Sequence, residues 1–341
     1  MGRGIVVGKR TANGYRPSLL HRLLKPRITG NAINGLGETQ RRRARPIYHW
    51  AELKFPHKRV WKLFLYLETR PPAMKRAVQE AIRLFYKPAA PVAAAQVHRS
   101  PEIRARQVKE FALEHEADVV GIARLDQSWV FEGLTVTEPW VIVMGVQMNY
   151  ENLSTAPRMT AGLEVLNQYN RGHRAATALA DWIRAQGWDA RGFGAPFASP
   201  VLIIPAAIAA GLGQLGKHGS LINRKLGSSL RLAYVLTEMP LVADAPDFIG
   251  VDEFCMNCQL CAAQCPPDAI SDSKQMVRGE LKWYVDFDKC VPFFNDNYGC
   301  AICLAVCPWS RPGVADLLTT KMLTKIARAG KAGVPDKSSD G

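Results

Sequence analysis

All eight cysteines of this 341-residue chain fall within one stretch, from residue 255 to residue 307. The first four lie in the run CMNCQLCAAQCP, as Cys255, Cys258, Cys261 and Cys265. The other four are Cys290 and the three cysteines of CAICLAVCP, which are Cys300, Cys303 and Cys307. So many thiols in so short a stretch need a partner, and disulfides, a metal ion and an iron–sulfur cluster are the three available classes.

The spacing C-x2-C-x2-C-x3-C-P is that of bacterial ferredoxins, in which the fourth cysteine binds the other cluster of a pair. It therefore predicts two 4Fe–4S clusters. The expected ligands of the first cluster are Cys255, Cys258, Cys261 and Cys307. The expected ligands of the second are Cys265, Cys290, Cys300 and Cys303, where Cys290 is displaced upstream by an insertion of about seven residues relative to the compact motif.

Zinc and disulfides are the alternatives. A structural zinc ion usually takes two cysteine pairs that are separated by a dozen or more residues, and three cysteines at C-x2-C-x2-C crowd a tetrahedral ion. Disulfides require an oxidising compartment, and nothing in the sequence indicates secretion. The spacing favours the two clusters over both.

Composition indicates a folded protein with a real core, since 48% of the residues are hydrophobic. The longest apolar runs, 201–212 and 140–146, are too short to span a bilayer. The basic N-terminal residues lack an apolar signal-peptide core, and the triple arginine at 41–43 is not followed by a hydrophobic segment. We therefore expect a cytoplasmic protein without a transmembrane segment.

The positive charge is concentrated in the first third of the chain. Residues 1–110 contain 24 Lys and Arg against 6 Asp and Glu, whereas the remaining residues contain 20 against 24. Such asymmetry indicates a basic face with an acidic partner. An acidic electron donor such as ferredoxin or flavodoxin fits, as does an anionic membrane surface, while nucleic acid is the weaker hypothesis; a solvated extension without a partner is the alternative.

Periodicity predicts an α/β or α+β layered fold, of which we expect the α+β class. We expect irregular structure over 1–45, an aromatic and basic segment over 47–70 that lies on the main body, and a linker over 87–95. Helices are expected over 73–86, over 100–116 with Ser100 and Pro101 at its start, and over 169–186 with Gly187 as its cap. Strands are expected over 117–125, 140–148 and 229–239, with 140–148 central and covered on both faces.

A glycine-rich segment, residues 209–232, precedes the cysteines. Gly211, Gly213, Gly216 and Gly219 allow the backbone to approach a large ligand closely. The segment matches neither a phosphate-binding P-loop nor the dinucleotide fingerprint.

Taken with the cysteine run, this segment resembles the cobalamin-dependent reductive dehalogenases, to which the epoxyqueuosine reductases are related. The similar features are ALADWIRAQGW, AGLGQLGKHGSLI, GSSLRLAYVLTEMPL, FIGVDEFCMNCQLCAAQCP and YGCAICLAVCPW, and they span about residues 100–312. The resemblance implies a nitroreductase-like cobalamin-binding domain fused to a two-cluster bacterial ferredoxin-like domain. The expected divisions are a basic N-terminal region over 1–99, the cobalamin-binding domain over 100–245, the cluster domain over 246–315 and a tail over 316–341.

The resemblance also implies an oxidoreductase activity. Electrons would pass through the two clusters to a base-off cobalamin, with no protein histidine beneath cobalt, and halide would be removed from an organohalide. The residues expected to contact the corrinoid are Gly213, Gly216, Gly219, Ser220 and Leu221. We do not expect His173 or His218 to bind cobalt.

Tyr169 and Arg231 match the positions of the proton-donating tyrosine and its basic partner in the dehalogenases. A phenol is a weak acid at neutral pH, and an adjacent guanidinium stabilises the phenolate. Arg231 could also hold a departing halide. Alternatively, Tyr169 is an ordinary helix residue and Arg231 a surface residue of a strand.

One departure bears on the substrate. Arg174 stands where the epoxyqueuosine reductases carry an Asp, which argues against queuosine chemistry. Two alternatives stay open: a cobalamin-dependent reductase of a non-halogenated substrate, similar to epoxyqueuosine reductase, and an iron–sulfur electron-transfer protein without turnover.

Overall fold

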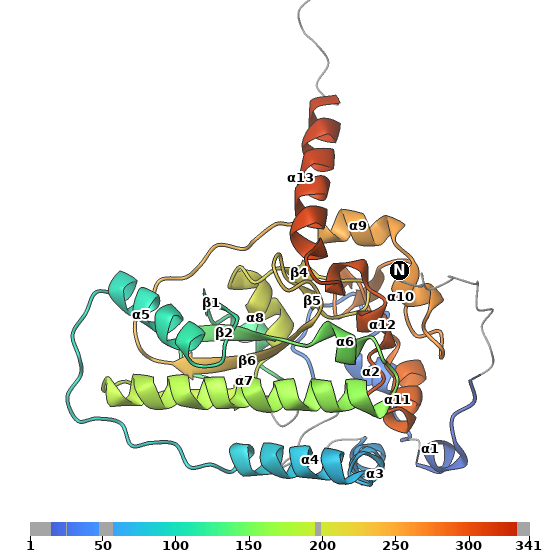
Figure 1. Ribbon diagram of the computed structural model, residues 1–341, viewed down its shortest axis with the longest axis horizontal. Coiled ribbons are helices and arrows are strands. Elements are labelled where there is room, and N and C mark those ends of the chain that lie inside the picture. Colours follow the sequence, from blue (N-terminus) through green and yellow to red (C-terminus); the bar gives the residue numbers. More distant parts are fainter. Residues whose placement is uncertain (1–14, 25, 48–56, 195–198, 333–341) are drawn as a thin grey trace, which may run out of the picture.

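The computed structural model describes residues 15–24, 26–47, 57–194 and 199–332, which form a mixed helix-and-sheet fold (Figure 1). Its centre is a four-stranded antiparallel sheet in the order β1-β2-β6-β3. The strands are β1 (Val119–Arg124), β2 (Trp140–Gln147), β3 (Ala190–Gly194) and β6 (Leu230–Thr237). The three predicted strands are thus confirmed, and β3 is an addition that the sequence pattern did not indicate.

Both faces of the sheet are covered, as the continuous apolar run of β2 predicts. Ile142 and Met144 pack with the helices α5 (Pro101–Glu114) and α7 (Met159–Ala185). Val141 and Val143 point to the opposite face and pack with α8 (Ile203–Ala209). Because side chains alternate along a strand, the residues of β6 divide between these faces in the same way.

Helix α7 is longer than expected. It begins at Met159 instead of residue 169 and ends at Ala185, where Gly187 adopts the predicted left-handed conformation with φ of 83°. Near its middle it crosses the sheet closely, since a Cβ atom on Gly172 would lie 3.2 Å from the Ala233 Cβ of β6. Glycine at this point lets the helix approach the strand that carries Arg231.

The region that contains the cysteines is built from short elements. They are α9 (Val251–Asn257), α10 (Leu260–Ala263), the hairpin β7 (Gln275–Val277) and β8 (Glu280–Lys282), α11 (Phe287–Asp296), α12 (Ile302–Ala305) and the 3₁₀ turn η2 (Pro308–Ser310). Helix α13 (Val314–Ala332) follows, so most of the segment expected as a tail is helical. Residues 333–341 lie outside the described residues.

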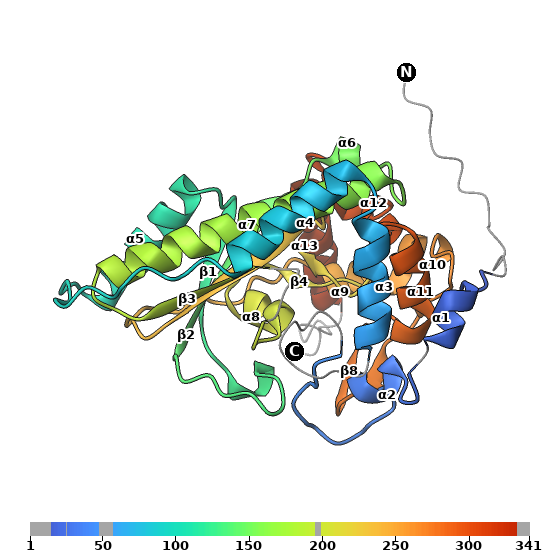
Figure 2. The ribbon, with the colours of Figure 1, turned by 90° about the horizontal axis from the view of Figure 1, so that it is seen from below.

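The described part of the N-terminal segment lies on the main body, which was expected only for residues 47–70. It forms α1 (Leu19–Leu23), α2 (Gly30–Asn34), α3 (Lys58–Glu68) and α4 (Pro72–Phe85). Helix α4 runs along α7, and α3 and α2 contact α11 (Figure 2). The expectation of irregular structure over 1–45 is wrong at two places, because Ser18 and Thr29 accept backbone hydrogen bonds as the N-caps of α1 and α2. Residues 1–14 lie outside the described residues.

The remaining elements are small. They are η1 (Gln127–Trp129), α6 (Tyr150–Leu153), β4 (Gln214–Leu215) and β5 (Leu221–Ile222), of which the last two pair as a short hairpin. The segment over 87–95 contains no helix or strand, as expected for a linker. Across the part of the chain that the structure describes, no helix has both the length and the apolar character needed to cross a membrane.

Candidate functional site

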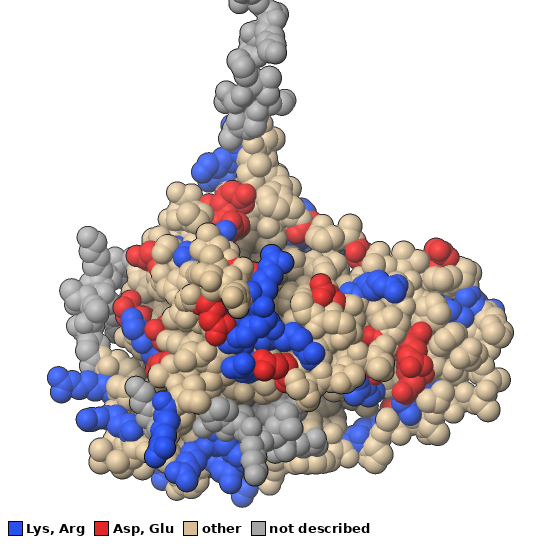
Figure 3. All heavy atoms as spheres, turned by 180° about the vertical axis from the view of Figure 1, so that it is seen from behind, with Lys and Arg blue, Asp and Glu red and all other residues tan. Residues whose placement is uncertain are grey.

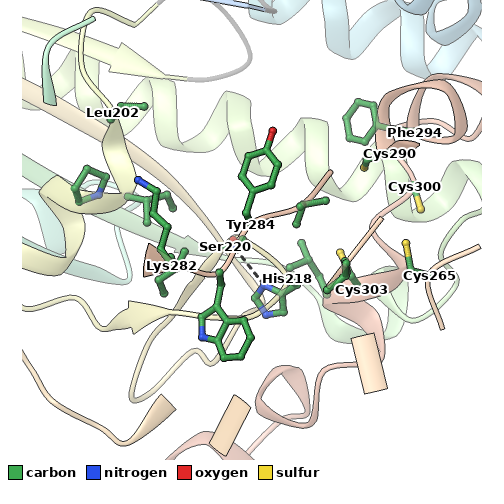
Figure 4. A pocket seen from close by; sticks show the side chains of 18 of the residues that line it. Leu202, His218, Ser220, Cys265, Lys282, Tyr284, Cys290, Phe294, Cys300 and Cys303 are labelled. Atoms are coloured by element: carbon green, nitrogen blue, oxygen red, sulfur yellow. Dashed lines mark hydrogen bonds between the residues drawn. The ribbon is translucent and has the colours of Figure 1, made fainter. Parts of the chain in front are cut away.

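A pocket of about 980 Å³ lies between the central sheet and the cysteine region (Figure 4). Tyr169 of α7 and Arg231 of β6 line it on the side of the sheet. Four cysteines line its other side, namely Cys265, Cys290, Cys300 and Cys303. Its volume is at the upper end of the range of about 300–1,000 Å³ that is typical of ligand sites. The pocket is therefore large enough for a sizeable ligand.

The fold brings Tyr169 and Arg231 together. Tyr169 precedes Gly172 and Ala176 by three and seven residues, so it shares the face of α7 that packs on the sheet. Arg231 lies on the same face of β6 as Ala233, which packs under α7. As a result the guanidinium carbon of Arg231 sits 5.2 Å from the centre of the Tyr169 ring.

Arg231 brings positive charge into the pocket without a carboxylate partner among the described residues. One of its terminal nitrogens donates a weak hydrogen bond of 3.4 Å to the Leu230 carbonyl. Its Nε atom is buried and has no hydrogen-bond partner within the described structure. A buried donor without a partner is costly, and such an atom at the edge of a pocket is typical of a ligand-binding site.

The glycine-rich segment forms a tight turn at the pocket wall. The Gly216 N–H donates to the Ser220 carbonyl at 2.9 Å, and the Gly219 N–H donates to the Gly216 carbonyl at 2.9 Å. His218 completes the turn, because its Nδ1 accepts from the Ser220 N–H at 3.2 Å and its Nε2 lies 3.1 Å from the Ser228 Oγ (Figure 4). Both ring nitrogens of His218 are thus engaged within the protein.

His218 is neutral in this environment. Burial lowers the pKa of His218 to about 4, and the positive charge of Arg231 acts in the same direction. Burial likewise lowers the pKa of His173, which does not line the pocket, to about 4. The expectation that neither histidine binds cobalt stays a prediction.

Of the five residues expected to contact a corrinoid, two line the pocket and three do not. Gly219 and Ser220 line the pocket. Gly213 has a φ of 133°, and a Cβ atom there would collide with the Ile222 carbonyl of β5, so this glycine permits the β4–β5 hairpin. A Cβ on Gly216 would lie 2.8 Å from the His218 ring, and the Leu221 side chain is buried in the core beneath the sheet. These three residues do not line the pocket.

The cysteines, none of which forms a disulfide, lie close to one another in the fold. Burial is the main cause that raises the pKa of the Cys307 thiol, and the neighbouring thiols of Cys255, Cys261 and Cys258 raise it further. Burial, followed by the neighbouring Cys300 and Cys265, raises the pKa of Cys290 to about 12. Burial is also the main cause of the raised pKa of Cys303, and Cys300 and Cys290 raise it further. Electrostatic repulsion between thiolates is strong only over short distances, so the members of each set of four lie close together in space.

The two sets are also neighbours, since Cys261 of the first set contributes to the raised pKa of Cys303 in the second. Its contribution is smaller than those of burial, Cys300 and Cys290. Among the described residues, no three His, Cys, Asp or Glu side chains are placed to hold a single metal ion. A cubane cluster does not require that closeness, because its four cysteines each bind a different iron. The thiolate is the form that binds metal, so iron would compensate the charge that burial here disfavours.

The sequence analysis missed one wall of the pocket, which comes from the β7–β8 hairpin and the residues after it. Lys282, Trp283 and Tyr284 line the pocket there. The Tyr284 hydroxyl donates to the Asn31 Oδ1 at 2.8 Å and so ties this wall to α2 of the N-terminal segment. The signal in the sequence was the run LKWY among the cysteines, but its position in space depends on the whole cluster region.

Arg174, which bears on the epoxyqueuosine comparison, does not line the pocket. It forms ion pairs of 2.7 Å with Glu80 of α4 and with Glu116, the residue that follows α5 by two positions. It therefore connects the helical layers that cover the sheet.

Comparisons with known proteins agree with these features. The family described as 4Fe-4S dicluster domain matches residues 254–310. The tetrachloroethene reductive dehalogenase of Sulfurospirillum multivorans is 30% identical over 246 residues, which cover 58% of this chain and 48% of that protein. The epoxyqueuosine reductase of Escherichia coli (strain K12) is 34% identical over 121 residues, covering 33% of this chain and 31% of the relative.

Among solved structures, a reductive dehalogenase whose structure is described as suggesting a mechanism for B12-dependent dehalogenation is similar with a TM-score of 0.69. It is 26% identical, and the match covers 80% of this chain and 42% of that one. The predicted resemblance to reductive dehalogenases, with epoxyqueuosine reductases as relatives, is thus confirmed. This chain spans about half the length, or less, of the curated relatives that it matches.

Proposed function

We propose that this protein is an iron–sulfur- and corrinoid-dependent reductive dehalogenase. The observation that carries the proposal is the shared pocket, in which Tyr169 and Arg231 face the four cysteines of the second set. The similarity to reductive dehalogenases supplies the reaction class. The reaction takes two electrons and one proton, replaces a carbon–halogen bond with a carbon–hydrogen bond, and releases halide.

The residues that line the pocket fit a corrinoid. The 980 Å³ volume, the unpaired Nε of Arg231 and the backbone of Gly219 and Ser220 at the pocket wall all suit a large amide-rich ligand. The antiparallel sheet with α7 and α8 on its two faces is compatible with the nitroreductase-like type of cobalamin domain that we propose for residues 100–245. A base-off corrinoid is consistent with a His218 whose ring nitrogens are both engaged.

When bound, the corrinoid supplies low-valent cobalt that breaks the carbon–halogen bond. The protein's own residues supply the rest. We propose that Cys255, Cys258, Cys261 and Cys307 hold one 4Fe–4S cluster, and that Cys265, Cys290, Cys300 and Cys303 hold another. Because the second set lines the pocket, its cluster would deliver electrons to the site, and the first would receive them from a donor.

Tyr169 is the proposed proton donor to the carbon product. Its phenol is positioned by α7, and the guanidinium over its ring stabilises the phenolate that remains after proton transfer. Arg231 also provides the positive charge that attracts the departing halide. The apolar part of the wall, which includes Trp129, Leu202 and Ile208, excludes water from the reacting atoms.

An acidic electron donor such as ferredoxin or flavodoxin is the proposed protein partner, in the cytoplasm. Lys and Arg side chains gather near the centre of the face opposite to that of Figure 1, beside a few acidic residues (Figure 3). A basic group of this kind steers an acidic protein toward the surface. The epoxyqueuosine alternative is the weaker one, since the similarity to the E. coli epoxyqueuosine reductase covers 33% of this chain and that to the dehalogenase covers 58%.

The test is anaerobic reconstitution with iron, sulfide and cob(II)alamin, followed by desalting. We expect about eight irons per chain, as two 4Fe–4S clusters require, with stoichiometric cobalt and a base-off Co(II) EPR signal. Reduced enzyme should then release halide from an organohalide. Eight irons without retained cobalt would refute the proposal and leave an electron-transfer protein.

A further inference from the structure

Lys217 is a buried cation beside the first set of cysteines. Only 1% of its surface is exposed. Its ammonium donates hydrogen bonds to the Gln259 Oε1 at 2.8 Å and to the Asp272 backbone carbonyl at 3.2 Å. It also lies 4.8 Å from the centre of the Trp283 ring. These partners accept hydrogen bonds from the ammonium or contact it, but none of them carries a full negative charge.

Burying a charge without a counter-charge is strongly unfavourable. No carboxylate of the described residues forms an ion pair with Lys217, since the nearby Asp252 pairs with Lys274 at 2.6 Å and accepts from the Trp283 indole N–H at 2.9 Å. The position is therefore explained only if another negative group lies next to it.

The cysteines supply that group. The Lys217 backbone N–H forms a hydrogen bond to the Cys255 sulfur, and the Lys217 charge acts on both Cys255 and Cys261. Gln259, which holds the ammonium, lies between Cys258 and Cys261 in the chain. The Lys217 ammonium thus lies beside the stretch that carries Cys258 and Cys261.

We propose that Lys217 is the counter-charge of the cluster held by Cys255, Cys258, Cys261 and Cys307, and that it raises the reduction potential of this cluster. This inference rests on the cluster assignment in the proposed function, but not on the corrinoid or the substrate. A cubane with four thiolate ligands is anionic and becomes more so on reduction. A buried ammonium stabilises the reduced state more than the oxidised state, and so favours electron entry at this cluster.

The test is an EPR-monitored redox titration of the reconstituted protein without cobalamin. The test variant Lys217→Met removes the charge and keeps an apolar stem of similar length. We expect one of the two one-electron steps to shift to lower potential by at least about 59 mV, which corresponds to a tenfold change in its equilibrium constant. Lys217→Arg should retain most of the wild-type potential because it keeps the charge.

Lys321→Met is the matched control. It removes the same charge from an exposed position on α13, the helix that packs on α9, where solvent screens it. If Lys217→Met holds too little iron for titration, Lys217→Gln, which keeps a hydrogen-bond donor, takes its place. Unchanged potentials in Lys217→Met or Lys217→Gln, or equal shifts in the Lys321 variant, would overturn the inference. Wild-type protein that fails to bind about eight irons would instead overturn the cluster part of the proposed function.

Discussion

Replacing Tyr169 with Phe isolates one atom of the proposed site. The ring keeps its place on α7, and the Arg231 guanidinium keeps its contact with the ring face 5.2 Å from the centroid. A cation–π contact depends on the aromatic face, which Phe retains. Only the hydroxyl, and with it the proton, is lost.

The expected effect follows from the role of that proton. A positioned general acid contributes about 100- to 10,000-fold to a rate, which equals about 3–5 kcal/mol of barrier. Ground-state binding is expected to change little, because the walls of the pocket and the charge of Arg231 are unaltered. The loss should therefore lie in kcat, with KM within a few-fold of wild type.

The assay is anaerobic halide release by enzyme whose iron and cobalt contents match those of wild type. Tyr150→Phe is a suitable control, because its hydroxyl donates to the Ala305 carbonyl at 3.2 Å and it does not line the pocket. Full turnover by the Tyr169 variant would refute the assignment of the proton donor. A change in KM alone would show that Tyr169 binds substrate without donating to it.

Three further predictions concern the cluster and the fold. Cys303→Ser should reduce bound iron from about eight to about four per chain and abolish turnover, as measured by iron analysis and halide release; eight retained irons would contradict the ligand assignment. Gly227→Ala should lower the free energy of unfolding, measured in denaturant, by more than about 2 kcal/mol. Gly227 has a φ of 59°, and a Cβ atom there would collide with the Trp309 carbonyl. Gly133→Ala is the control and should lower the free energy of unfolding by less, because Gly133 has a φ of 83° but open space around it. Burial raises the pKa of Glu68 from its ordinary 4.5 to about 7, so between pH 4.5 and pH 7 the folded state keeps a proton that the unfolded state loses. The free energy of unfolding should therefore fall by up to about 3 kcal/mol as the pH rises through this range, and it should stay low above it. Glu68→Gln should remove this pH dependence.

The sequence predicted those parts of the fold that local patterns encode. The Ser100 cap and Pro101 marked the start of α5, and the apolar run from Trp140 marked the central strand. In each case a short-range physical rule decides the outcome: a hydrogen bond to a side chain for the cap, and burial on two faces for the strand. Such features need no knowledge of the rest of the chain.

Other parts depend on contacts between distant segments. Helix α2 is five residues long, and it is held by Asp288, which accepts from the Gly30 and Asn31 backbone N–H groups at 2.8 and 2.9 Å. The wall formed by Trp283 and Tyr284 belongs to the pocket only because the cysteine region folds against the sheet. Neither contact leaves a periodic signal in the sequence. The resemblance supplied Tyr169 and Arg231, but their meeting in space needed the fold.

The glycine-rich segment links the two halves of the site. Between Gly216 and Gly219, Lys217 reaches toward the first set of cysteines, while His218 lies at the wall of the pocket beside Arg231. Two adjacent residues can serve two sites because neighbouring side chains of an irregular segment diverge, and the flanking glycines permit the tight turn that presents both. A change in the conformation of this turn would alter the surroundings of the first cluster and the shape of the pocket together. The segment therefore connects the proposed point of electron entry with the proposed reaction site.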